Sequence, residues 1–191
     1  MRRIVQSLAA LSVLALGACS GGGSVLNFDS SSTPDHVILT VQGPTNLARV
    51  LPGAGLPISA VAVRGTQNGF INSNRFKWSA VLTTGQTYNF TADGNQQRNC
   101  ASINVTSGGV TSPLVADWGI YIAIDPTNEA NIEFIPPTII PVPTGATSIT
   151  PNYPYCVTVS ATVLNGSGTT PTAGATGSIT VVVVNPQSPL G

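Results

Sequence analysis

The cysteine at position 19 is the first residue whose surroundings indicate chemistry. Arg2 and Arg3 give the chain a positive start, an apolar run from residue 4 to residue 16 follows, and small residues precede Cys19. This pattern is typical of a secretory signal. This apolar run of 13 residues is shorter than the roughly 20 that a membrane-spanning helix needs. We therefore expect residues 1–18 to be a signal peptide that is removed on export.

The residues around this cysteine also resemble a lipidation site. Leu16-Gly17-Ala18-Cys19 is similar to the lipobox of bacterial lipoproteins. In that family the signal is cut before the cysteine, which then carries acyl chains. The resemblance implies a lipid-anchored protein with an extracytoplasmic body. Ser20 stands where an Asp would retain such proteins at the inner membrane, which favours the outer membrane where there is one. The alternative is an ordinary cleaved signal that a cysteine follows by chance.

The other two cysteines, Cys100 and Cys156, form an even pair once Cys19 is acylated. An exported protein lies where disulfides form and persist, and closing a loop of about 57 residues would contribute about 4 kcal/mol. Cys156 shares a strand face with Thr158, Ser160 and Thr162, so we expect the bridge on the polar side or rim of the sheet. The alternative to the bridge is two free thiols. A metal site on these cysteines and His36 is not expected, because their spacing matches no known set of metal ligands.

Residues that could catalyse a reaction are few and scattered. The chain has one histidine, His36, which we expect to open the first strand in solvent, and it has no Gly-x-Ser-x-Gly sequence for a serine hydrolase. Carboxylates that could pair for glycoside hydrolysis are Asp93, Asp117, Asp125, Glu129 and Glu133. Asp125 begins a segment typical of an Asx turn, which lacks the full calcium-loop pattern. We expect no catalytic residue, no metal and no cofactor.

Aromatic side chains are the remaining candidates for binding, because exposed rings can stack on sugars. The possibilities are Trp118, Tyr121, Tyr153 and Tyr155. Alternation from residue 120 to residue 124 would place Ile120, Ile122 and Ile124 toward the core and Tyr121 outward. Trp118 and Tyr121 are therefore the possible ligand-binding residues, and ordinary packing is the alternative. A proline-rich segment, 136–143, is expected to be an extended crossover or loop.

Composition favours an all-β body. Charged residues make up 7% of the chain, while Val, Ile, Thr and turn-forming residues are abundant. Removing Arg2 and Arg3 from seven basic residues leaves five against seven acidic ones, a net charge of about −2. These charges are too few and scattered to indicate a nucleic-acid partner. Gly and Ser dominate the segment after Cys19, which indicates a flexible tether over residues 19–34.

The rest of the chain, residues 35–191, is expected to form one β-domain. Period-2 alternation is clearest in the strand 156–163, where Val157, Val159, Ala161 and Val163 share one face. The strands expected with it are 37–42, 58–64, 76–82, 87–92, 102–106, 120–124, 131–135 and 178–184. The predicted core contains Leu39, Val61, Trp78, Phe90, Ile122, Val157, Val159 and Val181, of which Val61 is the least certain because its strand is apolar on both faces.

Three of these segments resemble bacterial immunoglobulin-like domains. They are Phe76-Lys77-Trp78-Ser79, the run from Tyr155 to Ala161, and Ile179-Thr180-Val181-Val182-Val183. The family pattern is a Trp on strand C, a Tyr- and Ala-bearing strand F and a final Val/Thr strand. The resemblance implies an antiparallel Greek-key β-sandwich. Such a domain needs about 100 residues, so the excess, roughly 93–152, is expected to enlarge the central region as an insertion or extra strands.

The features together predict a lipid-anchored, non-catalytic immunoglobulin-like module of the cell envelope. The resemblance implies a spacer or binding role, in adhesion, envelope assembly or display. The expected partners are the membrane, through the lipid anchor, and an unidentified protein or glycan. The alternative function is a carbohydrate-binding module on the same anchor.

Overall fold

Strands dominate the computed structural model, which describes residues 34–42, 48–64, 69–71, 75–89, 97–150, 152–165 and 172–187. Within these ranges there is no α-helix, and the one helical element is a 3-10 turn, η1 (Gly119–Tyr121). The predicted all-β class is therefore confirmed. The predicted signal peptide, residues 19–33 of the predicted tether and Phe90 lie outside the described residues.

The first sheet is antiparallel throughout. Its order is β1 (His36–Val41), β3 (Leu56–Arg64), β12 (Asn131–Phe134) and β11 (Ile122–Ile124), and β4 (Gly69–Ile71) pairs with β3. Alternation along β3 buries Leu56, Ile58, Ala60 and Ala62. This sheet therefore has one apolar face that must be covered by another layer.

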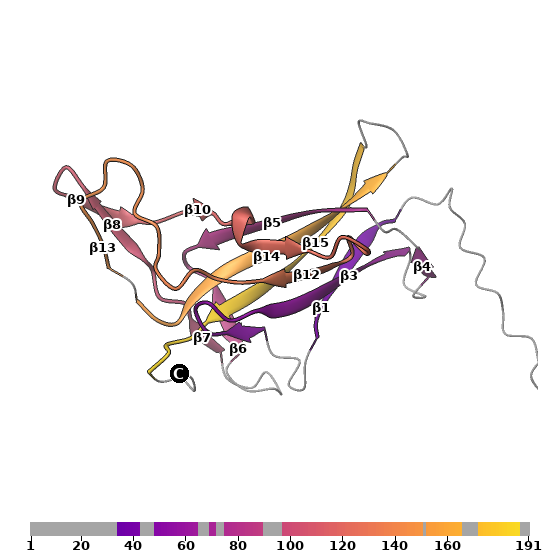
Figure 1. Cartoon of the computed structure of the whole chain (residues 1–191), viewed down its shortest axis with the longest axis horizontal. Coiled ribbons are helices and arrows are strands. Elements are labelled where there is room, and N and C mark those ends of the chain that lie inside the picture. The colour runs from indigo at the N-terminus through magenta and orange to yellow at the C-terminus, as the bar shows by residue number, and fades with distance from the viewer. Residues whose placement is uncertain are drawn as a thin grey trace, which may run out of the picture.

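The second sheet supplies that layer. Its order is β10 (Ala116–Asp117), β5 (Phe76–Thr83), β14 (Tyr155–Asn165), β15 (Thr172–Val183) and β2 (Arg49–Val50). All neighbours are antiparallel except β2, which runs parallel to β15. Buried residues of both sheets form one hydrophobic core, as in a β-sandwich (Figure 1). The indole N–H of Trp78 donates to the carbonyl of Glu129 over 2.7 Å and so ties β5 to the turn before β12.

The core holds most of the residues predicted for it. Trp78, Val157, Val159 and Val181 are buried, while Leu39 and Ile122 are partly buried and pack against the same cluster. The prediction for Val61 is wrong. Val61 is only half-buried and pairs directly with the exposed Ile38, so it lies on the outer face of the first sheet. Because β3 is apolar on both faces, its pattern did not indicate which set of residues turns inward.

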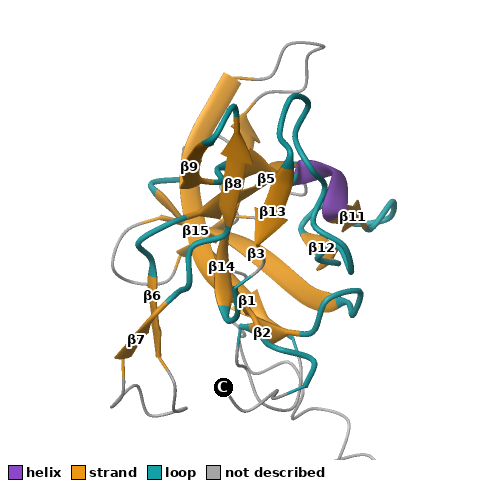
Figure 2. Cartoon of the chain, turned by 90° about the vertical axis from the view of Figure 1, so that its left-hand side faces the viewer, coloured by secondary structure: helices purple, strands orange, loops and turns teal. Residues whose placement is uncertain are grey.

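The enlargement of the domain comes from two insertions between strands of the sandwich. The first, 84–115, contains β6 (Thr87–Asn89), β7 (Gln97–Asn99), β8 (Asn104–Ser107) and β9 (Val110–Pro113). The second, 135–154, contains β13 (Ser148–Thr150). β6 pairs with β7, while β13, β8 and β9 form a three-stranded sheet to which both insertions contribute (Figure 2). The predicted excess, 93–152, therefore also included β10, β11 and β12, which belong to the main sheets.

The insertions lie at the end of the sandwich opposite to the point where the described chain begins. Pro34 precedes Asp35, whose N–H donates to Val63 at the same end as the β14–β15 hairpin. The first insertion leaves β5 after Thr83, and the second enters β14 at Tyr155, at the far end of both strands. Figure 1 shows β8, β9 and β13 at one end and the N-terminal strand reaching the other.

We predict that Gly177→Ala lowers the free energy of unfolding by about 1–3 kcal/mol, the usual cost of overpacking. A Cβ at this position of β15 would overlap the backbone carbonyl of Val37, where β1 closes one side of the sandwich. Urea unfolding measures the effect, with Ser178→Ala as the matched control because Ser178 is exposed on the same strand. Equal stability of the two variants would contradict this close approach of the sheets.

Candidate binding surface

The aromatic residues that sequence indicated for binding gather in one cluster where the insertions meet the sandwich. Trp118 makes edge-on contacts with Tyr121, at 5.6 Å between ring centroids, and with Tyr155, at 5.7 Å. Tyr153 contacts Tyr155 at 5.3 Å. Edge-to-face pairs at such distances are favourable beyond their buried area. The rings of this cluster thus pack mainly against one another, and only those at its edge can contact a ligand.

Trp118 is 2% exposed, so its ring cannot stack on a sugar in this structure, and the ligand-binding expectation for it is corrected. Tyr121 is half-buried against the core, not outward as expected, while Ile120 is 83% exposed. The reason is the 3-10 turn at Gly119–Tyr121, begun by the N–H of Gly119 donating to Asp117 over 2.9 Å. The strand begins only at Ile122, so alternation counted from Ile120 places Ile120 and Tyr121 wrongly, although Ile122 does pack against the core.

Tyr155, at the centre of the cluster, is fully buried, and its hydroxyl has no hydrogen-bond partner among the described groups. Burial, with smaller contributions from Tyr153 and Tyr121, raises the pKa of this phenol far above its ordinary value of 10.0. A phenol that stays neutral and unpaired in the core does not act as a base at physiological pH. Its role is packing, at the cost of an unsatisfied polar group.

A groove of about 320 Å³ lies beside this cluster. Its wall is mostly apolar and consists of Thr138, Ile139, Ile140, Val142, Ile149 and Tyr153. Ile139 is 82% exposed and Val142 is 56% exposed, whereas Ile140 is buried. The proline-rich segment 136–143 was predicted as a crossover or loop and forms no strand, but sequence reasoning did not select its isoleucines. The sequence feature that could have indicated a groove here is three large apolar residues in a short stretch bounded by prolines.

Hydrogen bonds between the two insertions shape this groove. The N–H and hydroxyl of Thr147 both donate to the carbonyl of Thr106, over 2.8 and 3.0 Å. The Asn152 side chain donates to Ser102 over 2.9 Å, and the Ser107 hydroxyl donates to Gly145 over 2.8 Å. Buried Ile103 and Leu114 extend the sandwich core into this region. The second insertion supplies the whole groove wall, and these contacts hold it against the first insertion.

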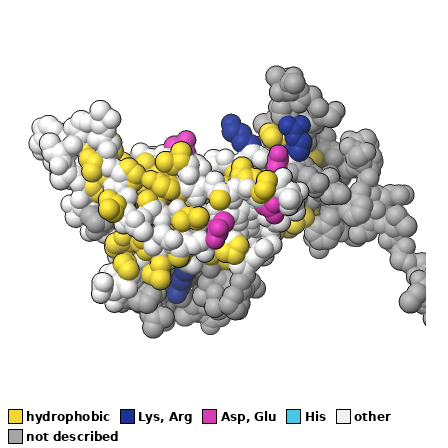
Figure 3. Space-filling view, in the orientation of Figure 1, with side chains coloured by type: hydrophobic (Ala, Val, Ile, Leu, Met, Phe, Trp, Pro, Cys, Tyr) yellow, Lys and Arg dark blue, Asp and Glu magenta, His cyan; other side chains and the backbone are white. Residues whose placement is uncertain are grey.

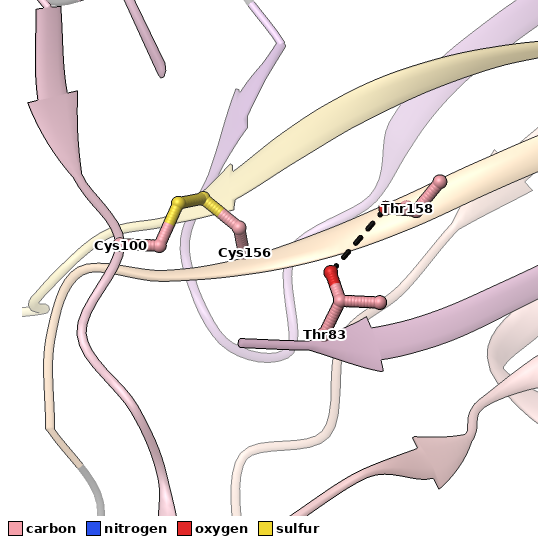
Figure 4. Close-up of a disulfide and its surroundings, with 4 residues drawn as sticks. All are labelled: Thr83, Cys100, Cys156 and Thr158. Atoms are coloured by element: carbon pink, nitrogen blue, oxygen red, sulfur yellow. Dashed lines mark hydrogen bonds between the residues drawn. A yellow bond between two sulfur atoms is a disulfide. The ribbon is translucent and has the colours of Figure 1, made fainter. Parts of the chain in front are cut away.

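A disulfide joins the first insertion to the second sheet. Cys100 and Cys156 are bonded with 5.6 Å between their Cα atoms, within the usual range (Figure 4). Cys156 lies on the face of β14 that carries Thr158, as expected from alternation, and Thr158 is 3.3 Å from the Thr83 hydroxyl. The bridge therefore lies on the predicted polar side of the sheet, but it is buried there, since Cys156 is 0% exposed and Cys100 7%. Tyr88, Val182 and Val184 cover the bridge in a small second cluster.

Two of the candidate carboxylates lie at one groove in the described part of the chain. Asp125 and Glu133 line a shallow groove of about 420 Å³ on the first sheet, together with Gln42, Asn131 and neighbouring residues. Asp125 forms the predicted Asx turn: it accepts the hydroxyl of Thr127 over 2.7 Å and its N–H over 2.8 Å, which lowers the pKa of this carboxyl. A general acid needs a raised pKa, so Asp125 is not suited to that role.

The described ranges contain neither a cluster of metal ligands nor a helix able to span a membrane. No group of three or more His, Cys, Asp or Glu side chains gathers there as a metal site would require. His36 contacts Asp35 at the exposed start of β1, as expected for a solvated residue. No helix in these ranges has the length and apolar character to cross a membrane.

Comparison of the chain with protein-family models, with curated proteins and with solved structures found no significant match.

The buried phenol leads to a pH prediction. Tyr155→Phe should raise the free energy of unfolding at pH 7 by about 1 kcal/mol, because the variant removes an unsatisfied buried hydroxyl. In the parent protein the pKa is raised on folding, so stability should fall once the pH exceeds the unfolded value of about 10. Thermal unfolding from pH 8 to pH 11 should show a shallower alkaline loss in Tyr155→Phe than in the control Tyr153→Phe. Identical profiles would contradict the burial of this phenol.

The disulfide leads to a second prediction. The variant Cys100→Ala/Cys156→Ala should lose a few kcal/mol of stability but keep its β-sheet circular dichroism, because the opposite face of β14 remains packed in the main core. The intact bridge should resist mild reductant in folded protein, since both sulfurs are covered. Alkylation with mass spectrometry measures that resistance. Rapid reduction of the folded protein would contradict the burial of the bridge. Loss of all β-structure in the double variant would contradict a main core that is stable without it.

Proposed function

We propose that this chain is a lipid-anchored, non-catalytic immunoglobulin-like module that presents a binding surface away from its membrane, in adhesion, envelope assembly or display. The observation that carries the proposal is that the two ends of the domain differ. The chain enters the sandwich at one end, and both insertions, with the apolar groove, extend from the other.

Strand order supports the immunoglobulin-like part of the proposal. In that family strands A, B, E and D form one sheet and C, F and G the other. The order β1-β3-β12-β11 matches A-B-E-D, and β5-β14-β15 matches C-F-G, with β10 as C′. Strand β2, beside β15, would be the second part of strand A. The disulfide departs from the antibody pattern, because it joins the F-like β14 to the first insertion and not to the B-like β3.

The tether supports the anchored orientation. Residues 20–33 are rich in Gly and Ser, and a flexible chain of that length spans roughly 20 Å between its ends. A lipidated Cys19 would therefore hold the Pro34 end of the body near the membrane. The groove would then face outward, where partners approach. Acyl chains anchor firmly, since each buried methylene contributes about 0.8 kcal/mol.

The distribution of side chains supports a binding role without catalysis. His36 lies at the start of β1, at the opposite end from the groove, and the carboxylates of Asp125 and Glu133 lie over the first sheet. The groove itself is lined mostly by apolar side chains, with the Thr138 hydroxyl and the Tyr153 phenol. Such a surface suits recognition of an apolar partner. With Trp118 buried, no observation favours the carbohydrate-binding alternative.

We predict that Cys19→Ser leaves the protein unprocessed or releases it from the membrane, because the acylated sulfur would be lost. Membrane fractionation, detergent partitioning and intact mass measure the outcome, and Ser20→Ala is the matched control that should stay anchored. A parent chain that begins at a residue other than Cys19, or carries no acyl mass, would contradict the anchoring.

A further inference from the structure

We infer that the groove face of the second insertion pairs with the same face of a second copy of this chain. The face is defined by Ile139, Ile140, Val142, Ile149 and Tyr153. The inference deepens the proposed function by naming the partner of the binding surface, and it depends on that function for the shared orientation of anchored copies.

The shape of the face suits a self-complementary contact. A two-fold interface uses the same patch on both subunits, so the patch must carry both a projection and a hollow. Here the hollow is the groove of about 320 Å³. The projections are Ile139 and Val142, which are 82% and 56% exposed on the same short segment. In a two-fold pair, the projecting isoleucine of each copy can enter the groove of the other and bury apolar surface on both sides.

The absence of charge also favours a second copy. No Asp, Glu, Lys, Arg or His occurs between residues 99 and 116, nor from residue 134 to the end of the chain. These stretches supply the three-stranded sheet and the whole groove wall. Figure 3 shows only hydrophobic and uncharged side chains at the end carrying this sheet. Two identical faces usually risk like-charge repulsion, which costs several kcal/mol, and these faces carry no such penalty.

Anchoring favours the pairing further. Copies held on one membrane by equal tethers present their grooves at the same height, and confinement to a surface raises their effective concentration. A contact smaller than the roughly 1,000 Å² expected of a stable dimer in solution can then be populated.

Photo-cross-linking tests the pairing. The lipidated full-length protein, with p-benzoylphenylalanine replacing Ile139, is reconstituted into phosphatidylcholine vesicles and irradiated. We expect a covalent dimer, whereas the same group at Thr176, an exposed residue of β15 near the opposite end, should give none. Adding Val142→Asp should lower the dimer yield at least tenfold by placing two carboxylates in the contact. The matched Ile38→Asp, an exposed apolar residue on β1, should not lower it.

Each outcome decides the inference. Cross-links to lipid alone, no dimer, or an equal yield in Val142→Asp would overturn it, provided thermal unfolding shows that the variants fold. The unlipidated Cys19→Ser protein, held by an N-terminal hexahistidine on nickel-chelating vesicles, repeats the test without native acylation. A dimer on those vesicles would support the pairing even if Cys19 proved not to be lipidated, so the two proposals can fail separately.

Discussion

Two adjacent residues at the start of β14 hold the insertions on the sandwich, one from each face of the sheet. Tyr155 points into the main core and contacts Trp118 and Tyr153, while Cys156 points to the opposite face and bonds Cys100. Side chains of a strand alternate between faces, so neighbouring residues can fasten two different segments. The first insertion is thereby bonded to β14 and the second leads directly into it, and the groove depends on both.

The contacts of Tyr155 and the disulfide of Cys156 explain how a small sandwich keeps two long insertions ordered. Loops of this length usually cost conformational entropy and remain mobile. Here Ile103, Leu114 and Ile140 continue the main core into the insertions, and β8 pairs with β13 across the two of them. The apolar groove is a by-product of that packing, because the segment between β12 and β13 covers the joint with some apolar side chains and exposes others.

Sequence patterns predicted the parts of the fold in which only one face of a strand is apolar. Alternation in β5 and β14 identified Trp78, Val157 and Val159 as core residues and placed Cys156 on the opposite face. The patterns failed where both faces are apolar, as at Val61, and where a turn interrupts the count, as at Ile120 and Tyr121. The groove could not be predicted, because no alternation pattern shows that the segment 138–142 lies against Ile149 and Tyr153.

The functional account requires the insertions to be one ordered unit fixed to the sandwich. Hydrogen exchange of the full-length oxidised protein, followed by mass spectrometry, measures this directly. The account predicts that peptides covering 101–107 and 147–150 are protected to a similar degree as peptides from β5, because the β8–β13 pairing and the disulfide restrain them. Exchange of these peptides within seconds, while β5 and β14 stay protected, would show that the insertions open independently and would contradict a preformed groove.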